Sequence, residues 1–107
     1  MSDAPPTIPV RVQLPTHLRT LAGVEGEVTV QVEGARPTVS SVLDALEHRF
    51  PTLKGTIREH GAGERRAYMR YFAGGEDISH DPPDRPLPEP VCRGEEPLQV
   101  LGAISGG

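Results

Sequence analysis

Hydrophobic and polar residues alternate along two early stretches of the chain, which is the pattern of half-buried strands. In "TIPVRVQL", residues 7–14, every second residue from Ile8 to Leu14 is apolar. "EVTVQVEG", residues 27–34, repeats the pattern with three valines at alternate positions. The segment between them is short and glycine-punctuated, as a hairpin connection should be. We therefore predict two antiparallel strands joined by a hairpin loop.

The spacing of apolar residues then changes to three and four in "RPTVSSVLDALEHRF", residues 36–50, which is a helical period. The apolar positions are Val39, Val42, Leu43, Leu46 and Phe50. Thr38 is a suitable N-cap, and Pro51 ends the pattern because a residue before proline avoids the helical region. The sequence predicts a helix of roughly three turns with one apolar stripe, which must lie across one face of a sheet.

The rest of the chain is less regular. Residues 51–66 are polar with a few apolar positions and predict a short helical turn followed by a loop. "RAYMRYFAGGEDIS" reads as a strand and a tight turn at Gly74–Gly75. It contains the aromatic cluster Tyr68, Tyr71 and Phe72, for which we expect one face in the core and the other in a docking patch. After a proline-rich stretch, "PLQVLGAIS" predicts a last strand that fades into small residues.

Strands with one apolar face and a helix with one apolar stripe form a stable two-layer α+β domain. The order of elements predicts a mixed four- or five-stranded sheet with one main helix packed across it, which is the β-grasp, or ubiquitin-like, fold. We expect residues 1–107 to form a single domain. Within it we expect residues 1–6 to be disordered, 81–97 to form a proline-rich loop, and 102–107 to form a flexible C-terminal tail.

Composition and charge narrow the function classes. Proline and glycine number 12 each, but they gather near the ends, in the proline-rich stretch and at turns, so a folded domain is favoured over disorder. The net charge of -4 is the wrong sign for a nucleic-acid binder. No apolar run is long enough to span a membrane, and the first residues do not resemble a signal peptide. We therefore expect a cytoplasmic protein without nucleic-acid or membrane partners.

Few side chains suggest chemistry of their own. Cys92 is the single cysteine, so no internal disulfide can form, and an inert free thiol is favoured over a sulfur-relay role. The four histidines are scattered without metal-ligand spacing. Gly74–Gly75 is followed by two acids, which suits a turn better than a phosphate-binding loop. We expect no catalytic residues, no metal and no bound cofactor.

Several stretches together resemble the ubiquitin-like sulfur carriers of the MoaD/ThiS type, which include the small subunit of molybdopterin synthase. They are "VRVQLPTHLRTLAG", "PTVSSVLDALEHRFPTLKGTI", "RYFAGGEDIS" and the terminal "AISGG". The likeness runs from about Val10 to Gly107, and "LPTHLR" is similar to the cysteine-pathway branch. The chain departs from the family pattern at Gly74, at Gly102 and in its longer proline-rich segment.

The resemblance implies a protein cosubstrate rather than an enzyme. An ATP-dependent activating enzyme of the ubiquitin-activating type would adenylate the Gly107 carboxylate, and a sulfur donor would convert it to a thiocarboxylate. A sulfur-accepting synthase would then take the sulfur. The small residues Gly106 and Ser105, with Ile104 as an anchor, would let the tail enter a narrow channel, since a Cβ on the last two residues would crowd it.

Other functions stay open on the same sequence. The Gly107 carboxylate could instead be joined to lysines of target proteins, as in a ubiquitin-like protein modifier. The chain could also be a plain ubiquitin-like interaction domain, for which the tail would be irrelevant. Within the carrier class, the sulfur acceptor could lead to molybdopterin, cysteine, thiamine, thiolated tRNA or another sulfur metabolite.

Overall fold

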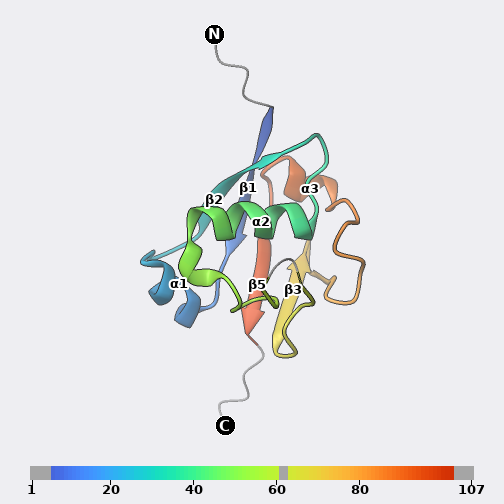
Figure 1. Cartoon of the computed structure of the whole chain (residues 1–107). Coiled ribbons are helices and arrows are strands. Elements are labelled where there is room, and N and C mark those ends of the chain that lie inside the picture. Colours follow the sequence, from blue (N-terminus) through green and yellow to red (C-terminus); the bar gives the residue numbers. More distant parts are fainter. Residues whose placement is uncertain (1–5, 61–62, 103–107) are drawn as a thin grey trace.

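A five-stranded mixed sheet forms one layer of the protein, and helices pack on it (Figure 1). The computed structural model describes residues 6–60 and 63–102. The strands are β1 (Thr7–Gln13), β2 (Val28–Glu33), β3 (Met69–Ala73), β4 (Glu76–Asp77) and β5 (Leu98–Gly102). Their order in the sheet is β2-β1-β5-β3-β4, so the first and last strands lie side by side at its centre. This confirms the predicted α+β, β-grasp architecture.

The pairing of strands follows from the alternation seen in the sequence. β1 and β2 pair antiparallel with Val10 opposite Val30, which puts the apolar residues of both strands on one buried face. β5 runs parallel to β1 and antiparallel to β3. Gly74 and Gly75 both have positive φ, at 59° and 81°, which the tight turn between β3 and β4 requires.

The main helix, α2 (Val39–Arg49), crosses the sheet as predicted (Figure 1). Thr38 caps its first turn by accepting a hydrogen bond from the Ser41 amide, and the Ser41 hydroxyl accepts one from the Thr38 amide in return. The helix ends before Pro51, and the short helix η1 (Pro51–Leu53) follows. All five predicted stripe residues face the core, four of them buried and Phe50 partly buried.

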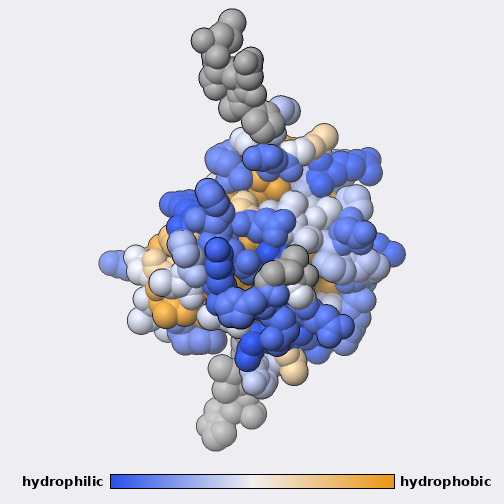
Figure 2. Space-filling model, in the orientation of Figure 1, coloured by the Kyte–Doolittle hydropathy of each residue, from blue (hydrophilic) through white to orange (hydrophobic). Residues whose placement is uncertain are grey.

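The core lies between the sheet and these helices. Its fully buried members come from the main strands, from α2 and the segment after it, and from the segment between β1 and β2. The largest are Leu18, Leu43, Leu46, Leu53, Ile57, Met69 and Leu98. Seen from the helix side, hydrophilic residues cover most of the surface, while hydrophobic ones gather over the helix α1 (Thr16–Ala22) (Figure 2).

The prediction of a plain hairpin loop between β1 and β2 was wrong, because this segment contains the helix α1 (Thr16–Ala22). The Pro15 carbonyl accepts hydrogen bonds from the Leu18 and Arg19 amides, which starts the helix without a side-chain cap. Gly23 ends it in the left-handed conformation, with φ of 74°, where glycine is favoured. The helix buries Leu18 in the core.

The proline-rich segment 81–97 also differs from the loop that was expected. It holds a single-turn helix, α3 (Glu89–Cys92), and contributes the buried residues Leu87 and Val91 to the core. Gly102, expected in the tail, is instead the last residue of β5 and pairs with Met69. Residues 1–5 and 103–107, which make up the rest of the expected disordered terminus and flexible tail, lie outside the described residues.

No helix in the described part of the chain has the length and apolar character needed to cross a membrane.

Candidate functional site

The candidate site begins where β5 ends, at the centre of the sheet. β5 pairs with β1 at its first two residues and with β3 along its whole length, so the pairing with β3 fixes its position up to Gly102. The residues that the sequence singled out, Ile104, Ser105, Gly106 and Gly107, lie outside the described residues. The structure therefore defines the rigid base from which they continue.

Apolar side chains are exposed at this base. Leu101 lies opposite Arg70 in the β3–β5 pairing, and its side chain is 40% exposed. Tyr68 precedes Met69, which pairs with Gly102, and is 54% exposed. Phe72 is half-buried on the face of β3 that points away from the core. Large exposed apolar residues that lie close together are typical of a protein-binding surface.

The aromatic cluster is divided between the core and the surface. One face was predicted to lie in the core, and this part of the prediction is confirmed. Tyr71 is buried, at 5% exposure, whereas Tyr68 is exposed and Phe72 lies between these extremes. This follows from the alternation of β3, in which Met69, Tyr71 and Ala73 face the core. Tyr68 and Phe72 therefore lie outside the core, and a docking patch on this face stays a prediction.

An ion pair stabilises the surface next to these residues. Arg70 on β3 pairs with Asp77 on β4. The Ser79 amide also donates a hydrogen bond to an Asp77 carboxylate oxygen, at 2.9 Å. The hydrogen bonds from Ser79, followed by that from Arg70, hold the pKa of Asp77 well below its ordinary value. The β3–β4 turn thus keeps a fixed negative charge beside Arg70.

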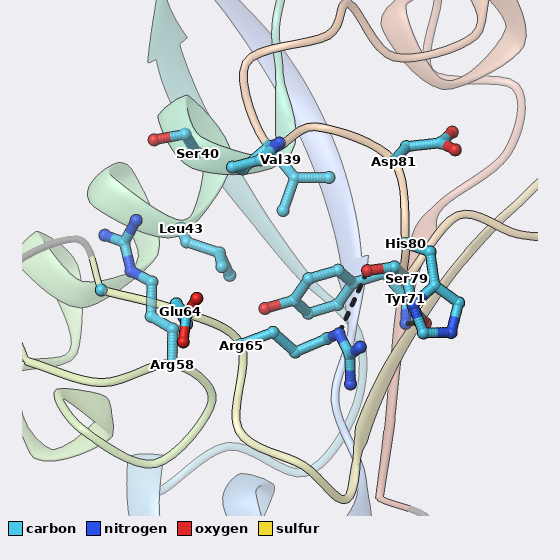
Figure 3. A pocket seen from close by; sticks show the side chains of 12 residues that line it. Val39, Ser40, Leu43, Arg58, Glu64, Arg65, Tyr71, Ser79, His80 and Asp81 are labelled. Atoms are coloured by element: carbon cyan, nitrogen blue, oxygen red, sulfur yellow. Dashed lines mark hydrogen bonds between the residues drawn. The ribbon is translucent and has the colours of Figure 1, made fainter.

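A hollow of about 410 Å³ lies on the other side of β3, between α2 and the segments around residues 63–65 and 79–83 (Figure 3). The Tyr71 hydroxyl points into it near Leu43 and Arg65, and Arg65 donates to the Ser79 carbonyl at 3.1 Å. Burial, opposed by the charges of Arg65 and Arg58, raises the pKa of Tyr71 to about 12. This phenol therefore stays protonated at neutral pH.

Sequence reasoning missed a buried ion cluster at the edge of this hollow. Arg58 donates to both carboxylate oxygens of Glu47, at 3.0 and 3.1 Å, and to Asp44 at 2.6 Å. Arg58 is 5% exposed and Glu47 is 9% exposed. One signal was available, because Glu47 continues the i, i+4 series of Val39 and Leu43 along the apolar stripe. The cluster ties the segment after η1 to α2.

The other side chains considered for chemistry, Cys92 and the possible metal ligands, do not come together in one site. Cys92 is partly buried at the end of α3, where burial and then the nearby Glu89 raise the pKa of its thiol. A raised pKa disfavours the nucleophilic thiolate, which agrees with an inert thiol. Within residues 6–60 and 63–102, no three or more histidine, cysteine or acidic side chains are grouped so that they could hold a metal ion.

Comparison with solved structures identifies the relatives of this fold. SAMP1 from Haloferax volcanii matches with a TM-score of 0.69 and 25% identity, over 92% of this chain and 99% of its own. CysO in the Amycolatopsis orientalis BexX/CysO complex matches with a TM-score of 0.68 at the same identity and coverage. Small archaeal modifier protein 1 from Methanosarcina acetivorans matches with 0.66 and 25%, over 94% of this chain and 98% of its own.

These neighbours are ubiquitin-like carrier and modifier proteins of the MoaD/ThiS type, so the resemblance seen in the sequence is confirmed. They are small carrier proteins rather than enzymes. No protein-family model and no curated protein matches the sequence.

Proposed function

We propose that this chain is a ubiquitin-like sulfur carrier whose reacting group is the carboxylate of Gly107. The observation that carries the proposal is its structural likeness, over nearly the full length of both chains, to SAMP1 and CysO. It is supported by a central strand, β5, that leads directly into "AISGG". The proposal requires that Gly107 carries the free carboxylate.

The proposed chemistry takes place on the active site of a partner enzyme. A Gly107 carboxylate oxygen attacks the α-phosphorus of ATP, and pyrophosphate leaves, so that an acyl-adenylate forms. Hydrosulfide then attacks the acyl carbon, AMP leaves, and a thiocarboxylate results. If the donor is a persulfide, the first product is an acyl disulfide, which a thiol must reduce to release the thiocarboxylate. A synthase that makes a sulfur-containing metabolite then accepts the sulfur.

We further propose that the exposed surface at the end of β5 docks onto the activating enzyme. Leu101 and Tyr68 offer apolar area, and Arg70 offers a guanidinium beside them. Leu101 lies two residues before residue 103, and the β3–β5 pairing places Arg70 opposite Leu101. Tyr68 adjoins Met69, the partner of Gly102, so docking here sets the point from which the tail starts. Binding energy from this surface offsets the entropy lost when the tail is ordered in the partner's channel.

The experiment that tests the carrier proposal is reconstitution followed by intact-mass measurement. The purified protein is mixed with an activating enzyme of the ubiquitin-activating type, ATP and sulfide. We expect the protein to gain the mass difference between sulfur and oxygen, and to gain nothing when ATP is omitted. An unchanged mass with an enzyme that thiolates SAMP1 or CysO in the same buffer would contradict the proposal.

A second function on the same carboxylate is attachment to lysines of other proteins. The likeness to small archaeal modifier protein 1 favours it. Both functions begin with adenylation, so the distinguishing step is the fate of the acyl group. When the reconstitution includes a lysine-rich target protein and no sulfide, a modifier forms an isopeptide bond that resists reducing agents. A carrier that only transfers sulfur forms none.

A further inference from the structure

We propose that Arg65 is a positioning residue for the reaction at the C-terminus, because its side chain fixes the part of β3 that holds the end of β5. The inference rests on the proposed function and adds to it a residue outside the docking surface formed by Leu101, Tyr68 and Arg70. Arg65 acts through the backbone of β3 and β5 rather than by contact with the reacting atoms.

The end of β5 depends on β3 for its position. β1 pairs with β5 at Leu98 and Gln99, whereas β3 pairs with β5 from Leu98 to Gly102. Within the described residues, β3 is therefore the strand that holds the last three residues of β5. Residue 103 follows directly, so a change at the start of β3 is passed to the point from which the tail starts.

The other edge of β3 is covered by β4 only at its far end, as far as the described residues show. β4 pairs with the last two residues of β3. Before them, the Tyr71 amide donates to the Ser79 hydroxyl and the Ile78 amide donates to the Tyr71 carbonyl, both at 2.8 Å. The backbone groups of Tyr71 therefore point away from β5.

Alternation along the strand gives Met69 and Arg70 different neighbours. Because successive residues of an antiparallel strand direct their backbone groups to opposite edges, those of Arg70 face Leu101 on β5 and those of Met69 face away from β5. The pair Arg70–Leu101 thus supplies the last hydrogen bonds of the β3–β5 ladder before residue 103. The Met69 amide donates to the Arg66 carbonyl at 3.0 Å, which leaves the Met69 carbonyl to be satisfied.

The Arg65 guanidinium satisfies this carbonyl and ties it to a second segment. Nη1 donates to the Met69 carbonyl at 2.8 Å, with a longer contact of 3.4 Å to the Arg66 carbonyl. Nε donates to the Ser79 carbonyl at 3.1 Å (Figure 3). In the described part of the chain, the acceptors of Arg65 are thus all backbone carbonyls. A guanidinium is a rigid fork with fixed donor directions, so it holds the start of β3 and the segment after β4 in a set relation.

Loss of this fork should change the rate of activation more than the binding of the activating enzyme. Without Arg65 the Met69 carbonyl must bond to water, and the Arg70–Leu101 pair opens more often. The carboxyl group then starts from a less well-defined position, and a misplacement of about 1 Å can cost roughly 100-fold in rate. The docking surface keeps its side chains, so we expect a fall in kcat with KM unchanged, which marks an interaction that matters in the transition state rather than in binding.

Arg66, the next residue, provides the matched control. Its side chain pairs with Glu59 at 3.3 Å in an exposed position. Its backbone carbonyl accepts the Met69 amide, and a substitution of the side chain retains that carbonyl. Arg66→Met therefore removes the same kind of side chain from the same segment without removing a donor to β3.

The kinetic test varies the concentration of the full chain in ATP-dependent thiolation by an activating enzyme that converts the wild type. We expect Arg65→Met to lower kcat about tenfold with KM within about twofold, since one charge-assisted hydrogen bond corresponds to a factor of about ten or more. Arg66→Met should match the wild type in both constants.

Amide hydrogen exchange in the free protein measures the hold on β5 without any enzyme. In Arg65→Met, the amides of Arg70 and Leu101 should exchange about tenfold faster, whereas the amides of the β1–β2 pairing should keep their wild-type rates. A purely structural role would instead raise exchange throughout the sheet and leave kcat of the folded protein unchanged.

Arg65→Lys separates the fork from the charge. Lysine keeps the charge but presents a point donor on a flexible stem, so it cannot hold both carbonyls in the same geometry. We expect both kcat and the exchange rates to lie between those of the wild type and Arg65→Met. If Arg65→Met does not fold, Arg65→Lys decides the question by the same two measurements.

The inference is overturned if Arg65→Met or Arg65→Lys keeps the wild-type kcat, if KM rises in place of a fall in kcat, or if exchange changes equally throughout the sheet. In each of these results the wild type is still thiolated, so the proposed function stands. A wild type that is not thiolated refutes the proposed function itself, and the positioning role with it.

Discussion

Replacing Arg58 by methionine is expected to destabilise the domain strongly, although no apolar contact of the core is removed. The Arg58 side chain is 6% exposed and forms a two-point ion pair with Glu47, whose side chain is 12% exposed. Methionine has a similar length but leaves the Glu47 carboxylate without its partner. A buried charge that loses its partner costs about 3–5 kcal/mol, out of a total of roughly 5–15 kcal/mol for a domain of this kind. Asp44 is largely exposed and adds little to this loss.

Urea unfolding at neutral pH, followed by circular dichroism, measures this effect. The matched control is Arg66→Met, because Arg66 pairs with Glu59 at 3.3 Å in an exposed position and should cost about 0–1 kcal/mol. A double variant, Arg58→Met with Glu47→Leu, should recover most of the loss, since it removes the unpaired charge. If Arg58→Met costs no more than the control, or the double variant is no better than Arg58→Met, the buried ion pair does not have the role assigned to it.

The other predictions concern the core, the β3–β4 surface and the docking surface. Leu46→Asp should unfold the domain, because Leu46 is fully buried and a carboxylate there costs several kcal/mol; cooperative melting near the wild-type temperature would show otherwise. Asp77→Asn should flatten the acid side of the stability curve. The pKa of Asp77 is lowered on folding, so its contribution is present above the ordinary value of about 4 and is lost as the pH falls below it; equal pH dependence in both proteins, by urea midpoint at several pH values, would contradict this. Leu101→Asp should slow ATP-dependent activation at least ~10-fold, as expected for an interface residue worth more than ~1.4 kcal/mol, with little change in melting; an unchanged rate would place the docking surface elsewhere.

The periodic parts of the sequence predicted the fold because their patterns are set by burial. In β1, β2 and α2 every predicted core position is at least partly buried, and Thr38 caps α2 as expected. These elements are long enough that tertiary contacts reinforce the local pattern. The five-stranded sheet follows once one striped helix has to cover the apolar faces of the strands.

The short helices were missed because their local signals are weak or ambiguous. α1 buries only Leu18 and has no side-chain cap, so its seven residues resemble a turn as much as a helix. The useful signal was Gly23, which follows an apolar spacing and ends the helix. At α3, two of the prolines that suggested a loop lie where they are tolerated: Pro88 is the N-cap, and Pro90 is in the first turn, where its missing amide costs no hydrogen bond.

The candidate site, like the fold, has one part that the sequence predicted and another that required the tertiary structure. Gly107 stays a prediction from the sequence, based on a motif at the end of a strand pattern. The surface at the end of β5 was not fully predicted, because the exposure of Tyr68 and Leu101 depends on how β3 and β5 are paired. The Arg58–Glu47 pair required the tertiary structure, since the two residues meet only when the segment after η1 folds back onto α2.

The most direct test of the central claim compares the full chain with a variant that lacks Gly107. Removing one residue retracts the carboxyl group by about 3.3 Å, and a misplacement of about 1 Å can cost roughly 100-fold in rate. Both proteins are incubated with activating enzyme, ATP and sulfide, and the thiocarboxylate is quantified by intact mass. We predict that the full chain is converted and that the shortened chain, with an unchanged melting temperature, is not. Equal conversion of the shortened chain would show that the Gly107 carboxylate is not the sulfur-carrying group.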